Sequence, residues 1–225
     1  MPPRIIRKRN NAYHHGDLRD ALVQSALRQV ELGGPESVSI SALAKQLGVS
    51  QPAPYKHFAD REALLTAVTV EAFRQFLATL RAALAKQSKR SKLSRLAQAT
   101  VDFGLRRGGL YRLMFVSRVT ASAPKGSELH GVAMEIFALA LEALEVPAIG
   151  SIRERSAMTV WATLHGVVML AEQGLFTGEI AQSSRAELVE EFVAQTKLAL
   201  NVAVEAAVRA GPTMEISPPL SPGPF

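Results

Sequence analysis

The side chains best suited to contact another molecule are concentrated within residues 50–58. Gln51, Tyr55, Lys56 and His57 are polar or aromatic at positions where a short helix would face solvent. A glutamine amide can pair with adenine at two atoms, and a lysine can reach guanine or a phosphate. These residue types are typical of a helix that enters the major groove of DNA. Gln51 is therefore the best candidate base reader, and Lys56 is the second.

Two short helices joined by a tight turn are expected to position these side chains. Ser39 or Ser41 can cap the first helix, because a side-chain oxygen there accepts an otherwise unpaired backbone N–H. Gly48 stands where that helix would end, while Ser50 and Asp60 can cap a second and a third helix. The pattern matches a helix-turn-helix. The residues expected in its core are Ile40, Leu43, Ala44, Leu47, Val49 and Phe58.

Two prolines lie inside the expected second helix. Pro52 falls in its first turn, where a missing N–H has little consequence. Pro54 stands where intrahelical bonding begins if Ser50 is the cap, so it removes an early hydrogen bond. Both prolines limit the backbone donors available to phosphates.

A longer pattern around these residues is specific to one family. It runs Ile40-x-x-Leu43-Ala44-x-x-Leu47-Gly48-Val49-Ser50-x-x-x-x-Tyr55-x-His57-Phe58-x-Asp60-Arg61-Glu62-x-Leu64-Leu65. It resembles the DNA-binding domain of the tetracycline-repressor (TetR) family. The resemblance implies that Tyr55 and His57 contact phosphates, with Ser39 and Arg61 as further phosphate anchors at the starts of flanking helices. With Ser50, Gln51 and Lys56, these residues form the candidate DNA-binding set.

Composition and charge agree with a nucleic-acid-binding module joined to a second region. The 225 residues carry a net charge of +6, with 48% hydrophobic residues and no cysteine. Residues 1–95 hold 16 Lys and Arg against 7 Asp and Glu, whereas residues 96–225 hold 10 against 13. A basic first half is the expected electrostatic footprint of DNA binding. The absence of cysteine excludes disulfides and fits a reducing compartment such as the cytoplasm.

A basic arm precedes the first expected helix. Arg4, Arg7, Lys8 and Arg9 either follow the DNA backbone or the adjacent minor groove, or form an ordinary solvated tail. The residues alone do not choose between these two interpretations.

Helical periodicity continues through the rest of the chain, and no strand pattern interrupts it. We expect helices at about 16–32, 60–86, 93–107, 110–119, 128–144, 152–173 and 185–208, in addition to the two short ones. Gly108-Gly109 is expected to end one of them. This periodicity predicts an all-α fold. The family resemblance implies that it divides into an N-terminal helix-turn-helix domain and a larger helical body for ligand binding and dimerisation. The expected divisions are an arm at 1–15, a DNA-binding domain at 16–60, the body at 61–210 and a proline-rich disordered tail at 211–225.

A short motif in the body resembles one subset of the TetR family. Trp161 and His165 lie four residues apart, so they share a helix face, and Gly166 follows. This Trp-x-x-x-His-Gly pattern resembles a C-terminal signature of that subset. Close approach of another helix would explain a glycine at 166. Both Trp161 and His165 suit a core or an interface as well as a ligand pocket.

The family resemblance also implies a dimer and an effector. Members bind a small molecule in the body and dimerise in a two-fold arrangement through their last two helices, which implies a palindromic operator. Methionines and aromatics suit an apolar ligand site, and they suit an ordinary core equally. The candidate ligand-binding residues are Phe103, Arg106, Tyr111, Met114, Phe115, Phe137, Trp161, His165 and Met169, with Met134 and Arg107 as further possibilities. The apolar stripe expected on the last helix is Leu188, Val189, Phe192, Val193, Thr196, Leu200, Val204 and Val208.

Other classes of function find little support. The histidines lack metal-binding spacing, and the chain has neither a phosphate-binding glycine loop nor a Gly-x-Ser-x-Gly elbow. Its longest uncharged stretch, residues 156–171, is shorter than the roughly 20 residues of a membrane span. We therefore expect no enzyme, metal, cofactor or membrane partner, and a repressor released from its operator by a small, largely apolar effector. The alternatives are an effector-independent architectural DNA-binding protein and a helical small-molecule carrier.

Overall fold

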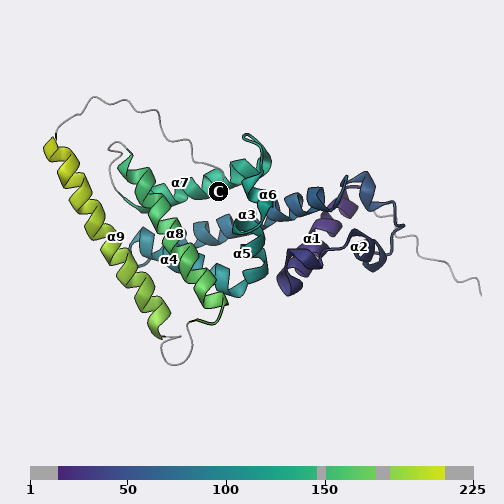
Figure 1. Cartoon of the computed structure of the whole chain (residues 1–225), viewed down its shortest axis with the longest axis horizontal. Coiled ribbons are helices and arrows are strands. Elements are labelled where there is room, and N and C mark those ends of the chain that lie inside the picture. The colour runs from purple at the N-terminus through teal and green to yellow at the C-terminus, as the bar shows by residue number, and fades with distance from the viewer. Residues whose placement is uncertain (1–14, 146–150, 176–182, 211–225) are drawn as a thin grey trace, which may run out of the picture.

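Helices account for all the regular structure in the described parts of the chain, residues 15–145, 151–175 and 183–210 of a computed structural model. Figure 1 shows an elongated arrangement, with α1 and α2 at one end and α9 at the other. The elements are α1 (His15–Gly33), η1 (Pro35–Ser37), α2 (Ile40–Gln46), η2 (Pro54–Lys56), α3 (Arg61–Ala85), α4 (Lys92–Arg106), α5 (Gly108–Phe115), α6 (Arg118–Ala121), α7 (Glu128–Ala143), α8 (Ile152–Glu172) and α9 (Ser183–Ala210), where η marks a 3-10 turn.

A small head and a larger body share one long helix. We call α1, η1, α2 and η2 the head, and α4 to α9 the body. Helix α3 packs against α1 at its start and against α4 and α7 further along. By length and composition α3 could cross a membrane, but its apolar residues are buried among these neighbours, as in a core helix. The predicted boundary at residue 60 thus falls just before a helix that belongs to both parts.

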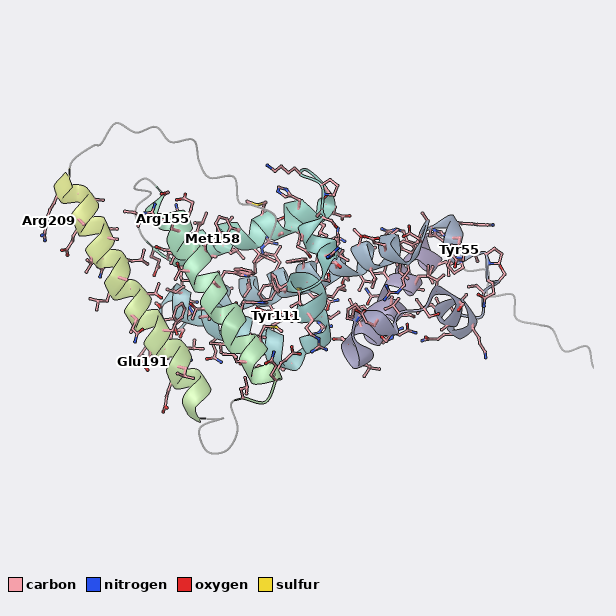
Figure 2. The ribbon with its side chains drawn as sticks, viewed as in Figure 1. Tyr55, Tyr111, Arg155, Met158, Glu191 and Arg209 are labelled. Atoms are coloured by element: carbon pink, nitrogen blue, oxygen red, sulfur yellow. The ribbon has the colours of Figure 1, made fainter. Side chains whose placement is uncertain are left out.

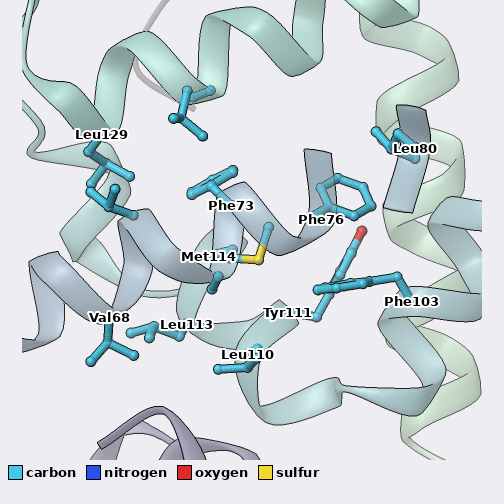
Figure 3. Close-up of a cluster of buried hydrophobic side chains, with 14 of the residues drawn as sticks. Val68, Phe73, Phe76, Leu80, Phe103, Leu110, Tyr111, Leu113, Met114 and Leu129 are labelled. Atoms are coloured by element: carbon cyan, nitrogen blue, oxygen red, sulfur yellow. The ribbon is translucent and has the colours of Figure 1, made fainter. Parts of the chain in front are cut away.

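The centre of the body is an aromatic core. Phe73 and Phe76 of α3 pack beside Phe103 of α4 and Tyr111 of α5, as Figure 3 shows. The rings of Phe76 and Phe103 lie 4.9 Å apart between centroids, and Phe115 makes an edge contact with Phe73 at 5.4 Å. Burial of such rings supplies much of the favourable free energy of folding. The same cluster of buried residues extends into the head without a break.

Most of the predicted helices are confirmed to within a few residues, with two differences in the body. Gly108-Gly109 begins α5 instead of separating two helices, and the predicted helix 110–119 ends at Phe115. A further turn, α6, follows within a stretch predicted to be partly loop. The basic arm, the proline-rich tail and most of the loop predicted at 177–183 lie outside the described residues.

Candidate nucleic-acid interface and effector cavity

Helix α2 forms as the sequence predicts. Ser39 is its N-cap, because the Ser39 Oγ accepts the N–H of Ala42 at 3.4 Å. The Oγ atoms of Ser39 and Ser41 are 3.1 Å apart. At the other end Gly48 has φ of 68°, a left-handed conformation that glycine adopts without strain. Ile40, Leu43 and Ala44 are buried, so the apolar face of α2 holds it against α1.

The second helix of the motif differs from the prediction. Ser50 caps no α-helix; residues 51–53 form a turn, and only the 3-10 turn η2 follows. The prolines are the physical reason. An α-helix capped by Ser50 would use the N–H of residue 54, which Pro54 lacks. The bonds that form instead include the three-residue bonds from Ala53 to Ser50 O and from His57 to Pro54 O, with one four-residue bond from Phe58 to Pro54 O. Pro54 is buried, and this fixes the turn against the rest of the head.

We call residues 50–57 the reading turn, and its side chains are presented to solvent. Tyr55 is 55% exposed and projects from the head at the end opposite α9, as Figure 2 shows. Gln51 and Lys56 are also exposed, whereas His57 is half-buried. The Gln51 amide donates to the carbonyl of Ser41 at 3.3 Å, which holds Gln51 beside α2. The candidate base readers therefore share one surface with the exposed Ser39, Ser41 and Ser50.

Arg61, the first residue of α3, is engaged within the protein. Its Nε donates to the carbonyl of Val38 at 3.0 Å, and its Nη2 donates to the carbonyl of Pro35 at 2.5 Å. Glu36 lies 3.7 Å from the same Nη2. Asp60 just before it caps α3 by accepting the N–H of Ala63 at 2.8 Å. The predicted phosphate anchor thus already has two carbonyl partners. The remaining candidates, Arg4, Arg7, Lys8 and Arg9, lie outside the described residues.

The body contains a small apolar cavity. Its volume is about 40 Å³, and its walls come from α3, α4, α5, α7 and α8. Apart from the hydroxyls of Thr100 and Tyr111 and the indole of Trp161, the lining is hydrocarbon. The lining residues are Phe76, Leu80, Leu96, Thr100, Tyr111, Phe115, Ile136, Ala140, Val160, Trp161 and Leu164.

Three rings are stacked at one side of this cavity. His165 lies between Tyr111 and Trp161, with ring centroids 5.6 Å and 5.3 Å apart. The Tyr111 hydroxyl and His165 Nδ1 share a hydrogen bond of 3.3 Å. Burial lowers the pKa of His165 from its ordinary value of 6.5, so the imidazole is neutral at pH 7. Burial and the nearby Glu172 raise the pKa of Tyr111, which keeps its phenol protonated.

The predicted ligand-binding residues separate into three groups. Tyr111, Phe115 and Trp161 line the cavity, and His165 contacts all three. Phe103 and Met114 are buried in the core, while Phe137, Met134 and Met169 are half-buried outside the lining. Arg106 is exposed and does not line the cavity. Leu80 and Leu96 line the cavity but were missed, because a leucine in a core helix carries no local sign of facing a void.

The contacts that join the head to the body were also not predicted from the sequence. Gly109 of α5 lies so close to α1 that an added Cβ would stand 2.1 Å from the carbonyl oxygen of Val30. Beside it, the Arg107 Nε donates to Glu31 of α1 and its Nη1 donates to Gln75 of α3, both at 2.5 Å. Arg107 therefore joins α1, α3 and α5 at one point. Of the two neighbouring arginines, Arg107 is therefore the half-buried one, and Arg106 is exposed.

The close approach expected at Gly166 is found at another glycine. An added Cβ at Gly166 would meet no atom of the described residues within 4 Å, so the predicted reason for that glycine is wrong within this chain. At Gly104 the added atom would stand 2.5 Å from Val168, so Gly104 is what lets α4 approach α8.

The last helix has two apolar faces where one was predicted. Val189, Val193 and Leu200 are buried against the chain's own body. Leu198 and Val202, outside the predicted stripe, are 67% and 60% exposed. Helix α8 likewise buries Val160 and Leu164 but exposes Met158, seen with Arg155 in Figure 2. A groove of about 400 Å³ runs between α8 and α9.

Comparison with known proteins agrees with this architecture. Residues 22–68 match the model of bacterial regulatory proteins of the tetR family, and residues 93–196 match that of the tetracyclin repressor-like C-terminal domain. The chain belongs to the TetR family. It is thus a DNA-binding transcriptional regulator, because the head supplies the helix-turn-helix and the body the family's C-terminal domain.

Two solved structures share this fold, and one further relative is named as a transcriptional regulator. A Rhodococcus sp. RHA1 protein of unknown function is 30% identical, with 84% of this chain and 98% of that chain covered and a TM-score of 0.69. An uncharacterised HTH-type transcriptional regulator of Mycobacterium tuberculosis is 26% identical over 70% of this chain and 71% of its own length. The Bacillus subtilis regulator FadR, solved with stearoyl-CoA, is 17% identical with a TM-score of 0.51, covering 76% and 96% of the chains, which shows the fold alone.

Proposed function

We propose that this regulator is a repressor that binds a palindromic operator as a two-fold homodimer and leaves it when a small apolar effector enters the cavity. The observation that carries the proposal is the placement of two sites on shared helices. The reading turn lies just before α3, and the cavity is lined by Phe76 and Leu80 of the same helix.

The reading turn supplies the DNA contacts in this proposal. Gln51 pairs with a base edge, Lys56 meets guanine or a phosphate, and Tyr55 and His57 hold phosphates. Ser39 and Ser50 are the further anchors on the same surface. Because η2 has few backbone donors, side chains must make most of these contacts. The basic arm with Arg4, Arg7, Lys8 and Arg9 extends the contact along the backbone.

The outer faces of α8 and α9 support the dimer. Leu188, Leu198 and Val202 recur at helical spacing on an exposed face of α9, and Met158 of α8 is exposed as well. Monomeric proteins seldom leave such apolar surface in water. A two-fold mate would cover it, with the α8–α9 groove receiving side chains of the partner.

The cavity sets limits on the effector. Its hydrocarbon walls favour an uncharged, largely apolar molecule that makes one or two hydrogen bonds, with Tyr111, Thr100 or His165 as partners. Cavities of about 150 Å³ hold a benzene, so at about 40 Å³ this one must enlarge to accept even a small ring. Binding must therefore displace side chains of one or more of the lining helices, α5 among them.

A displacement of α5 would also change the position of the head. Tyr111 and Phe115 face the cavity, while Gly109 on the same short helix rests on the Val30 carbonyl. A shift of α5 changes this contact and the Arg107–Glu31 pair, and so the position of α1. The effector then stabilises an arrangement of the two heads that does not fit the operator, which is a population shift.

The finer classification rests on the ring stack. We propose that the chain belongs to the subset of the family with a Trp-x-x-x-His-Gly signature, because Trp161 and His165 stack on one another beside the cavity. If Trp161 binds the effector directly, Trp161→Ala should alter the response to the effector and leave operator binding intact.

Selection of bound sequences from a random DNA pool tests the proposed function. A recovered palindrome supports a two-fold, sequence-specific regulator. Uniform coating without a recovered motif would instead support the architectural alternative. A screen of uncharged aromatic and aliphatic compounds for release of that operator then tests the effector, with Trp161→Ala and Phe115→Ala as cavity variants.

A further inference from the structure

We propose that Arg61 is a positioning residue that locks the start of α2 to the start of α3, and that its guanidinium does not contact DNA phosphates. This inference rests on the proposed DNA-binding function of the head and concerns how the reading turn is held. It differs from the role that the family resemblance implies for this position.

The contacts of Arg61 close the helix-turn-helix into a loop. Val38 directly precedes the N-cap of α2, and Arg61 is the first residue of α3, so the whole motif lies between the two bonded residues. Nε and Nη2 donate from one edge of a planar group to two carbonyls of the same turn, those of Val38 and Pro35. Only a guanidinium has this forked geometry; a lysine ammonium is a single point of charge.

The acceptors are themselves held in place. Val38 is 3% exposed and belongs to the core. Ser37 ties the same turn to α1, because its Oγ is 2.9 Å from the carbonyl of Gln29. The first turn of α3, where Arg61 lies, is fixed in turn by Asp60, which accepts the N–H of Ala63. We call the two hydrogen bonds from Arg61 to Val38 and Pro35 the clamp. The clamp therefore joins two rigid points, and the segment between them is supported from both ends.

The interior of that segment explains why a clamp matters here. An α-helical second element would be stabilised by its own backbone hydrogen bonds. The prolines leave this chain only a short 3-10 turn, whose hydrogen bonds are fewer and have poorer geometry. The position of Gln51, Tyr55 and Lys56 relative to DNA then depends on how firmly the ends of the motif are held.

Arg61→Lys and Arg61→Gln separate positioning from phosphate contact. Lysine keeps the charge and loses the fork, so the clamp predicts that both variants weaken operator binding about tenfold. The slope of log Kd against log salt should stay within error of the wild type, because no phosphate contact is lost. A phosphate contact predicts instead that Arg61→Lys binds within about twofold of wild type and that Arg61→Gln lowers the slope by about 0.9. That second pattern would overturn the proposal.

Hydrogen exchange of the free protein gives a readout that needs no DNA. The clamp predicts faster exchange at the backbone amides of Val38, Ala42 and Leu43 in both variants, with α7 unchanged. A uniform loss of protection across α1, α3 and α7 would mean a merely structural role and would also overturn the proposal. Arg81→Gln is the matched control. Arg81 is another arginine of α3, and it forms an exposed surface ion pair with Glu135.

The two proposals fail in different ways. If the wild-type protein selects no DNA sequence, the proposed function fails, and the exchange measurement still decides the role of Arg61. If an operator is found but the Arg61 variants bind it as the wild type does, only the clamp fails.

Discussion

The head and the body of this protein are held together by different physical means. The body is organised around fully buried rings such as Phe73 and Tyr111. The motif in the head has a thinner core and relies on polar tethers at its ends: the Ser39 cap, the Asp60 cap and the Arg61 bonds. Loss of a buried ring leaves a cavity, whereas loss of a tether leaves the chain folded but less well placed. Variants should therefore separate stability from DNA binding.

The largest effect is expected from a ring of the body. Phe73→Ala removes a side chain that is 1% exposed, and we expect the free energy of unfolding to fall by about 3–5 kcal/mol. Tyr55→Ala in the head should change it by less than about 0.5 kcal/mol while weakening operator binding. Urea unfolding measures both variants. Equal losses of stability would remove the distinction between the two regions.

The junction between the regions should be the next most sensitive place. Gly109→Ala puts a methyl against the Val30 carbonyl, and we expect a loss of about 1–3 kcal/mol or a displaced head with weaker operator binding. Gly131→Ala in α7 is the control, because an added Cβ there meets nothing within 4 Å. It should be neutral or slightly stabilising. Thermal unfolding and operator titration distinguish the two; a neutral Gly109→Ala would show that α5 and α1 are not tightly coupled.

Within the head, different variants should affect base recognition and phosphate contact separately. Gln51→Ala is expected to lose about 1–3 kcal/mol of discrimination at one base position, with little change in salt dependence. Lys56→Gln should lower the salt slope by about 0.9 if Lys56 holds a phosphate. Titration of operator variants at several salt concentrations measures both. Loss of discrimination in Lys56→Gln, with an unchanged slope, would make Lys56 the base reader.

The smallest effect is a pH dependence of the body. Burial lowers the pKa of His165 in the folded state, so the unfolded chain binds a proton more readily as pH falls through 6.5. The contribution of His165 to stability is thus present above that pH and is lost as the pH falls below it. His165→Gln should flatten the fall in melting temperature between pH 7 and 5. An identical pH profile in the variant would mean that the imidazole titrates as in water.

Local features of the head were largely predictable from sequence. Ser39, Gly48 and Asp60 act through atoms within a few residues, so the caps and the turn were correctly placed. The second helix was wrong because the combined effect of Pro52 and Pro54 was underestimated. The two Arg61 bonds join residues 23 and 26 positions apart, and no local pattern indicates such contacts.

Features that depend on tertiary packing were harder to predict. Gly108-Gly109 has the composition of a break, yet Gly109 is required by the approach of α1, far away in sequence. The stripe predicted on α9 omits the exposed Leu198 and Val202 and includes Val208, which is 66% exposed, because helical spacing alone does not distinguish a buried apolar face from an exposed one. The ring stack was partly anticipated, because Trp161 and His165 share a helix face, but Tyr111 comes from another helix.

The clamped, proline-rich reading turn has a consequence for changing the DNA target. Gln51, Tyr55 and Lys56 are exposed, and none of them supports the core of the head. The scaffold beneath them is held by Pro54, Asp60 and Arg61, which need not vary. A library that randomises only those three exposed positions should thus yield folded proteins with new operator preferences. The same rigidity leaves the turn little freedom to adapt its backbone, so each variant is expected to recognise a narrow set of sequences.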